Sequence, residues 1–181
     1  MKLQEITKSL KAGKIGVIPT DTIYGIVGSA LNPQTIEKIY RLKKRSKSKP
    51  FIILISALSD LKQFNVKLSK QQKKFLEKIW PNPVSVVLSG LAFRMPKDKW
   101  LISLLKRVGP LVGPSANFAG EKPAENIEQA KRYFKDNVDF YCEAARSSYI
   151  DGGKIKSKSS TIIELNRSGK FKVLRQGTYR V

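Results

Sequence analysis

The segment from Pro19 to Ile26 places a dense set of polar side chains directly after a short apolar run. The run Ile15–Ile18 has the composition of a buried strand, and Pro19 ends it because proline cannot donate a ladder hydrogen bond. Two hydroxyls, a carboxylate and a phenol follow, and Gly25 closes the predicted turn. In α/β proteins, ligands bind beyond the carboxyl ends of strands. The segment therefore predicts either a ligand site or, equally well, a strand-to-loop transition in which hydroxyls cap the next element.

Predicted helices and strands alternate through the first half of the chain, and short strands cluster toward its end. This order is typical of an α/β layer structure on a mixed sheet, in one domain that spans residues 1–181. The candidate helix N-caps are Asn32, Ser59, Ser69 and Asp98, and segment 147–160 has the composition of a mobile loop. The predicted helices cover 3–10, 32–40, 70–79, 98–108 and 127–134, and the predicted strands 15–18, 51–55, 84–88, 92–94, 111–112, 138–142, 161–165 and 171–174.

The charge balance and the missing residue types limit the ligands and the kinds of catalytic site that the chain can have. Lys and Arg total 35 against 14 Asp and Glu, a formal net charge of +21. Such an excess attracts nucleic acids and nucleotides, although drift in genome composition would also produce part of it. The absence of histidine excludes a histidine triad and a zinc site. The single cysteine, Cys142, is expected to be a buried hydrophobe in a reducing cytoplasm. No apolar run is long enough to cross a bilayer, so we expect a cytoplasmic protein.

A basic run between residues 41 and 49 contains Lys43, Arg45 and Lys49. Residues two apart share a face in an extended segment, so Lys43 and Arg45 are expected to grip one anion together there. The alternative is a solvated basic helix end, because cations also suit the helix dipole.

A second polar turn, Gly113-Pro114-Ser115-Ala116-Asn117, follows the predicted strand 111–112. Ser115 and Asn117 are candidates to bind phosphate or sugar oxygens, and a turn that stabilises its own backbone is the equal alternative. The turn is neither a Walker loop nor a nucleophile elbow. No pair of carboxylates has a spacing that suggests a dedicated metal site.

Several short motifs follow one another along the chain. They are Pro19-Thr20-Asp21-Thr22-Ile23-Tyr24-Gly25, Lys43-x-Arg45-x-x-x-Lys49-Pro50, Trp80-Pro81-x-Pro83, Arg94-Met95-Pro96, Pro114-Ser115-Ala116-Asn117-x-x-Gly120, Ser160-Thr161-Ile162-Ile163-Glu164 and Leu174-Arg175-Gln176-Gly177. Taken in order, these motifs closely resemble those of the YrdC family of threonylcarbamoyl-AMP synthases, in its short, single-domain form. The resemblance covers roughly residues 5 to 178. It implies a twisted, mixed α/β sheet around a large basic cleft.

This resemblance implies a nucleotidyltransferase that joins L-threonine, bicarbonate and ATP into threonylcarbamoyl-AMP and releases pyrophosphate. Partner proteins would then transfer the group to tRNA, and Mg²⁺ would accompany the ATP phosphates. Such a reaction needs positioning and charge neutralisation more than an activated nucleophile. Lys43 and Arg45 are the catalytic candidates. The implied ATP-binding residues are Arg45, Lys49, Ser85, Ser115, Asn117 and Arg175, and the implied threonine-binding residues are Thr22, Ser160 and Arg94.

The chain departs from the family pattern at three places. Leu54 stands where many longer relatives have histidine, Ser159 replaces a frequent glutamate, and Gln176 replaces a frequent proline. These changes affect the expected threonine contacts and the closing loop more than the reaction.

Two other functions compete with the synthase interpretation. A basic, non-catalytic module that binds tRNA or double-stranded RNA would have the same net charge. A carbamoyl-transfer domain like that of hydrogenase maturation proteins ranks lower, because those chains carry zinc-finger regions and this one has no Cys-x-x-Cys.

Overall fold

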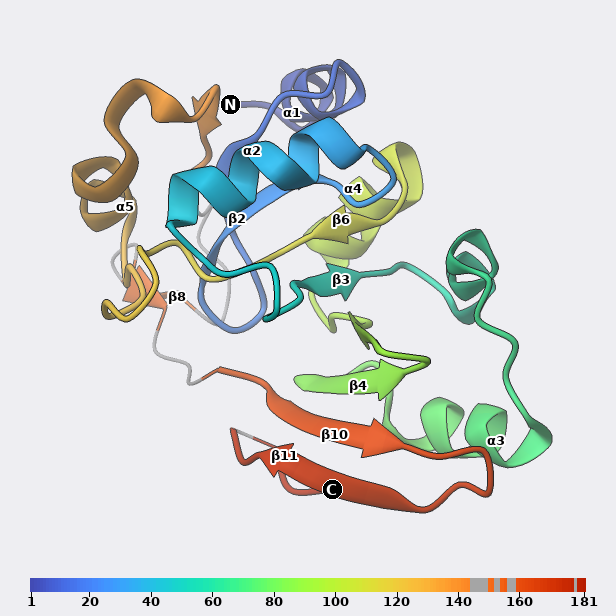
Figure 1. Ribbon diagram of the computed structural model, residues 1–181. Helices are drawn as coiled ribbons and strands as arrows, with labels where there is room; N and C mark the ends of the chain where they lie inside the picture. The colour runs from blue at the N-terminus through green and yellow to red at the C-terminus, as the bar shows by residue number, and fades with distance from the viewer. Residues whose placement is uncertain (144–149, 152–153, 156–158, 178) are drawn as a thin grey trace.

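The computed structural model describes residues 1–143, 150–151, 154–155, 159–177 and 179–181. Within them, nine strands form one twisted mixed sheet in the order β11-β10-β4-β5-β3-β6-β2-β1-β7, which can be followed from bottom to top in Figure 1. The strands are β1 (Gly16–Pro19), β2 (Tyr24–Ser29), β3 (Ile52–Leu54), β4 (Val84–Leu88), β5 (Leu91–Arg94), β6 (Leu111–Val112), β7 (Phe140–Tyr141), β10 (Thr161–Leu165) and β11 (Phe171–Arg175), and a separate pair joins β8 (Ile150–Asp151) to β9 (Lys154–Ile155).

Parallel and antiparallel pairings mix along this sheet. β1–β2, β4–β5 and β10–β11 are antiparallel hairpins. β10 lies parallel to β4, β3 lies parallel to β5, and β1 lies parallel to β7. These parallel pairs join segments far apart in the sequence, and the pairing of β1 with β7 brings the N-terminal part of the chain beside a much later segment.

The α-helices are α1 (Leu3–Lys11), α2 (Pro33–Lys43), α3 (Lys70–Ile79), α4 (Lys99–Val108) and α5 (Ile127–Phe134), with two 3₁₀ turns, η1 (Leu58–Phe64) and η2 (Lys135–Asn137). Three predicted N-caps are confirmed. The Asn32 side chain accepts from the amides of Gln34 and Thr35, Ser69 from Gln72, and Asp98 from Leu101. Each cap satisfies an amide that the first helical turn leaves without a partner.

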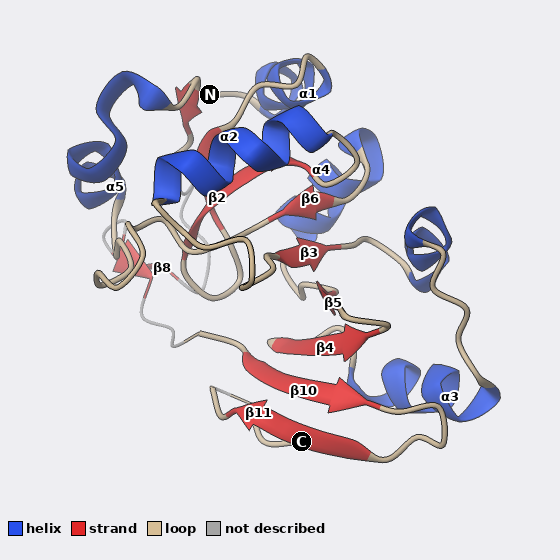
Figure 2. Ribbon diagram, viewed as in Figure 1, coloured by secondary structure: helices blue, strands red, loops and turns tan. Residues whose placement is uncertain are grey.

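Two apolar clusters cover opposite faces of the sheet. Ile6 and Leu10 of α1 pack with Leu101 and Leu105 of α4 on one face. Helices α2, α3 and α5 contribute to the larger cluster on the other face, and Figure 2 shows α2 crossing in front of β2. Alternation within strands produces the two faces: in β2, Ile26 joins the larger cluster and the next residue, Val27, joins the smaller one.

The sequence expectations fail at several elements. Strand β2 was not predicted, and Gly25 lies inside it instead of closing the turn, since the turn ends at Ile23. Two glycines weakened the strand signal there. Ser59 is not an N-cap, because η1 begins after Ala57 and the Asp60 carboxylate accepts from the amides of Ser56 and Ala57.

The predicted strand 138–142 shortens to β7. Most of the predicted mobile loop 147–160 lies outside the described residues. Cys142 is buried as expected, at 5% exposure. No helix in the described ranges has the length and apolar character that crossing a bilayer requires.

Candidate functional site

A cavity of about 320 Å³ opens where the polar turns meet the sheet. Its lining comes from the β1–β2 turn and the start of β2, from Arg45 and the segment that leads into β3, and from strands β4 and β5. The turn after β6, Pro123, β10 with the two residues before it, and Arg175 of β11 complete the lining. Both polar turns contribute to this lining, with Thr20 and Thr22 from the first turn and Gly113 to Ser115 from the second. The implied site residues in the lining are Thr22, Arg45, Arg94, Ser115, Ser160 and Arg175.

Three arginines approach one another in this cavity. Arg45 follows α2, Arg94 ends β5 and Arg175 ends β11. Burial, together with the charges of Arg94 and Arg45, lowers the pKa of the Arg175 guanidinium. The described lining contains no carboxylate. Guanidinium groups bind phosphates and carboxylates through paired hydrogen bonds. The side chains of this cavity are therefore suited to bind an anion.

Each cavity arginine is held by its neighbours. Arg45 Nε donates to the carbonyl of Lys49 at 3.0 Å, and its guanidinium lies over the Phe51 ring at 5.5 Å. Arg175 Nη2 donates to the Ser160 carbonyl at 2.7 Å. Backbone contacts of this kind fix the direction of a long side chain before the ligand arrives.

Arg94 alone among the three has a carboxylate partner in the described chain. Its Nη2 lies 3.0 Å from Asp21 Oδ1, and the two side chains are only 5% and 3% exposed. Its Nη1 donates to Thr22 Oγ1 at 3.1 Å. The ion-pair contact lacks hydrogen-bond alignment, and Arg94 Nε has no hydrogen-bond partner among the described residues.

Lys43 occupies a different place from the one expected. It is the last residue of α2, not part of an extended segment, and it is 1% exposed. Its ammonium donates to the carbonyls of Ser115 and Asn117, the latter at 2.6 Å. The premise that Lys43 and Arg45 share one face of an extended segment is therefore wrong, because α2 continues through Lys43 and the Lys43 side chain contacts the loop after β6. Lys43 does not line the cavity.

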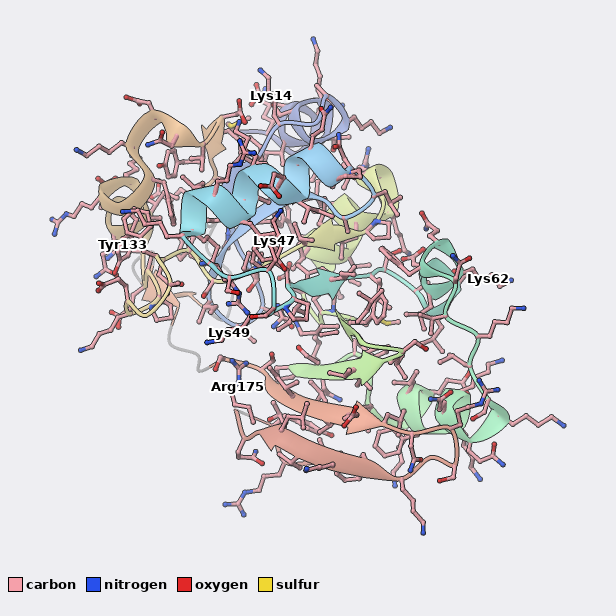
Figure 3. The ribbon with its side chains drawn as sticks, in the orientation of Figure 1. Lys14, Lys47, Lys49, Lys62, Tyr133 and Arg175 are labelled. Atoms are coloured by element: carbon pink, nitrogen blue, oxygen red, sulfur yellow. The ribbon has the colours of Figure 1, made fainter. Side chains whose placement is uncertain are left out.

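Three further candidates also lie outside the cavity lining. Ser85 is completely buried, and its hydroxyl lies 2.9 Å from that of Ser160. Asn117 donates to the carbonyls of Phe118 and Glu121, which stabilises its own turn. Lys49 is exposed, and Figure 3 shows it on the same side of the molecule as Arg175. Ser85 therefore contacts Ser160, which lines the cavity, and Asn117 stabilises the turn that carries Ser115. Neither Ser85 nor Asn117 lines the cavity itself.

Thr20 and Asp21 are site residues that the sequence reasoning did not select. Thr20 lines the cavity, and Asp21 lies behind Arg94. Both belong to the polar segment that follows β1, which the sequence analysis identified as a candidate ligand site. The sequence did not indicate that Thr20 lines the cavity or that Asp21 pairs with Arg94. No group of three or more Cys, Asp or Glu side chains in the described ranges is placed to hold a metal ion.

The family model Sua5_yciO_yrdC, described as "Telomere recombination", matches residues 8–177. The chain belongs to this Sua5/YciO/YrdC family. It is 27% identical to the threonylcarbamoyl-AMP synthase of Mus musculus over 198 residues, covering 97% of this chain and 66% of that one.

Solved structures share the fold. The P. abyssi Sua5 complexed with L-threonine superimposes with a TM-score of 0.81 at 24% identity, covering 97% of this chain and 54% of that one. Full-length HypF in the phosphate- and nucleotide-bound form gives 0.78 at 20% identity, covering 96% of this chain and 28% of that one. This chain thus spans about half of the Sua5 chain and less than a third of HypF.

Proposed function

We propose that this chain forms threonylcarbamoyl-AMP and pyrophosphate from L-threonine, bicarbonate and ATP. The observation that carries the proposal is the meeting of Arg45, Arg94 and Arg175 with threonine and serine hydroxyls in one cavity. The family membership and the names of the relatives agree with it. A triphosphate needs several cations, and an amino acid needs hydroxyl and charged partners beside it.

The chemistry fits groups that position substrates without acting as nucleophiles. The threonine amine reacts with bicarbonate to give a carbamate and water. An oxygen of the new carbamate carboxylate then attacks the α-phosphorus of ATP, and pyrophosphate leaves with the electron pair of the broken P–O bond. Arg45 and Arg175 would neutralise the phosphates, with Mg²⁺ on the phosphate oxygens. Thr22, Ser160 and Arg94 would hold the amino acid, and Ser115 would contact the nucleotide.

Lys43, Asn117 and Ser85 take supporting positions in this proposal. Lys43 and Asn117 hold the turn that carries Ser115, and Ser85 holds Ser160. Lys49 is a candidate contact for the outer phosphates, because it is exposed on the side of Arg175. Transfer of the product to tRNA by partner proteins is proposed as the next step.

Pyrophosphate release tests the reaction directly. The purified chain is incubated with ATP, L-threonine and bicarbonate, and each component is omitted in turn. We expect release only in the complete mixture, and a new product with the mass of threonylcarbamoyl-AMP. Release that does not depend on threonine, or none under any condition, contradicts the proposal.

RNA binding without catalysis is the second candidate. A separate hollow of about 480 Å³ lies beside α4, and its lining includes three lysines, Lys97, Lys99 and Lys106, next to apolar residues such as Met95 and Ile102. This hollow and the net charge of +21 favour a polyanion. Tight binding of tRNA by a chain that releases no pyrophosphate would favour the RNA module over the synthase.

A further inference from the structure

The buried ion pair of Asp21 and Arg94 lies directly behind the cavity, which Arg94 lines while Asp21 does not. Burying two charges costs several kcal/mol per ion before their attraction offsets it. Here the alignment is incomplete, since Asp21 Oδ1 and Arg94 Nε lack hydrogen-bond partners among the described residues. An ion pair with such imperfect contacts is weak evidence for a role in stabilising the fold. We therefore consider what the pair does to the charge of the neighbouring cavity.

The charge of Asp21 divides the cavity arginines into two kinds. Arg45 and Arg175 line the cavity and contact backbone carbonyls, and neither has a carboxylate partner among the described residues. Arg94 has a carboxylate at 3.0 Å that offsets its charge. A site with three unopposed guanidinium groups would attract polyphosphate but repel the ammonium group of an amino acid. Asp21 therefore creates one region of the wall where a group with a positive charge is tolerated.

The hydroxyls beside Arg94 are held by several short contacts. Thr20 Oγ1 donates its proton to the Ile23 carbonyl at 2.6 Å and accepts from the amides of Thr22 and Ile23 at 3.3 and 3.2 Å, so both of its lone pairs are engaged. The Thr22 hydroxyl lies 3.2 Å from that of Thr20 and accepts from Arg94 Nη1 at 3.1 Å. One lone pair and the proton of the Thr22 hydroxyl therefore remain for a ligand, and the contact with Arg94 orients them.

We infer that Asp21 is a positioning residue: through Arg94 it orients the Thr22 hydroxyl toward a polar group of the bound amino acid. The second oxygen of the Asp21 carboxylate also holds the side chain in place. Oδ2 accepts a hydrogen bond from the backbone amide of Lys97 at 3.4 Å, which connects Asp21 to the segment that follows β5. This inference rests on the proposed function, because it takes an amino acid as the ligand.

Asp21→Asn is the main test, because asparagine keeps the shape of the side chain and removes its charge. Threonine and ATP affinities are each measured by calorimetry on the folded variant. We expect threonine binding to weaken about tenfold or more, while ATP binding stays the same or becomes stronger, since Arg94 is no longer neutralised. A merely structural role for Asp21 would weaken both affinities together. Unchanged threonine binding by the variant would overturn the inference.

Two further variants separate the steps. In an Arg94→Gln background, Asp21→Asn should change threonine affinity less than threefold, because Asp21 acts through Arg94. Arg94→Lys keeps the positive charge but loses the forked guanidinium that reaches both Asp21 and Thr22. We expect it to weaken threonine binding and to leave ATP affinity unchanged. This variant provides the test if Asp21→Asn does not fold. An equal loss from Asp21→Asn with and without Arg94 would contradict the route proposed.

Substrate analogues identify the group of threonine that Thr22 contacts. If Thr22→Val weakens binding of threonine and 2-aminobutyrate equally, the contacted group is the amine or the carboxylate; if only threonine binding is weakened, it is the hydroxyl. Either result supports the contact, and wild-type affinity of Thr22→Val for both overturns it. The proposed function is tested separately: an unsubstituted chain that binds neither threonine nor ATP refutes that function, whereas normal binding with an unaffected Asp21→Asn refutes only this inference.

Discussion

The Lys43 ammonium nitrogen lies 2.6 Å from the backbone carbonyl oxygen of Asn117 and 3.4 Å from its side-chain oxygen. This buried cation connects the end of α2 to the turn after β6, which carries Ser115 into the cavity. Arg45 follows two residues after Lys43 and lines the same cavity. The short basic motif thus serves two purposes: one residue holds the loop, and the other faces the ligand.

Lys43→Met should lower the free energy of unfolding by about 2–4 kcal/mol at pH 7, because buried carbonyl oxygens lose their donor. Urea denaturation measures the change. Lys38→Met is the matched control: its exposed ion pair with Asp139 should contribute less than about 1 kcal/mol. Equal losses from the two variants would show that the Lys43 contacts do not hold the loop.

Lys43 also makes stability depend on pH. Burial, with a smaller contribution from the charge of Arg45, lowers the pKa of Lys43 to about 7, from an ordinary value of 10.5. Between these values the unfolded chain holds a proton that the native chain releases, so the free energy of unfolding rises with pH, by up to about 1.4 kcal/mol per pH unit. Urea denaturation from pH 7 to 9 should show a steeper rise in the unsubstituted chain than in Lys43→Met. Parallel curves would contradict the assignment.

Arg45→Ala should reduce pyrophosphate release about 30- to 1000-fold, with the fold retained. Loss of one cation that stabilises transferring phosphates typically costs about 2–4 kcal/mol of transition-state stabilisation. Arg41→Ala is the control, since Arg41 lies four residues earlier on the exposed side of α2 and pairs with Glu37. Normal rates in Arg45→Ala would mean that the basic run is a solvated helix end.

Ser85→Ala should raise the KM for threonine about two- to tenfold and leave the KM for ATP unchanged. The Ser85 hydroxyl is buried against Ser160 and does not line the cavity, so its loss removes a single hydrogen bond from a residue proposed to bind threonine. Steady-state kinetics with each substrate varied in turn measures the split. A larger effect on ATP would restore the direct nucleotide contact implied by the family resemblance.

Gly177→Ala should destabilise the chain by several kcal/mol, because a Cβ there would lie 2.2 Å from the Ser159 carbonyl oxygen. The displacement would also disturb the contact of Arg175 with Ser160. Gly90→Ala is the comparison: its Cβ meets nothing within 4 Å, so only its positive φ of 81° adds a cost of about 1 kcal/mol. Thermal unfolding separates the two, and similar melting temperatures would contradict the close approach at Gly177.

The sequence by itself determined most of the helices, their caps and the strands with continuous apolar runs. Local chemistry decides these features: Asn32, Ser69 and Asp98 cap helices with their own side chains, and β3, β4 and β10 follow runs of branched apolar residues. The ordered set of motifs also identified the family, since motif order along a chain is a property of the sequence. Strand β2 could not be predicted from the residue pattern, because its two glycines, Gly25 and Gly28, have low strand propensity.

Only the tertiary structure decided which polar side chains meet. Lys43 and Arg45 are two residues apart, yet the end of α2 sends one into the interior and the other into the cavity. Asp21 and Arg94 are far apart in the chain, and the packing of the β1–β2 turn against the end of β5 makes them partners. Distances between distant segments depend on strand order and register, which long-range packing determines and local residue patterns do not.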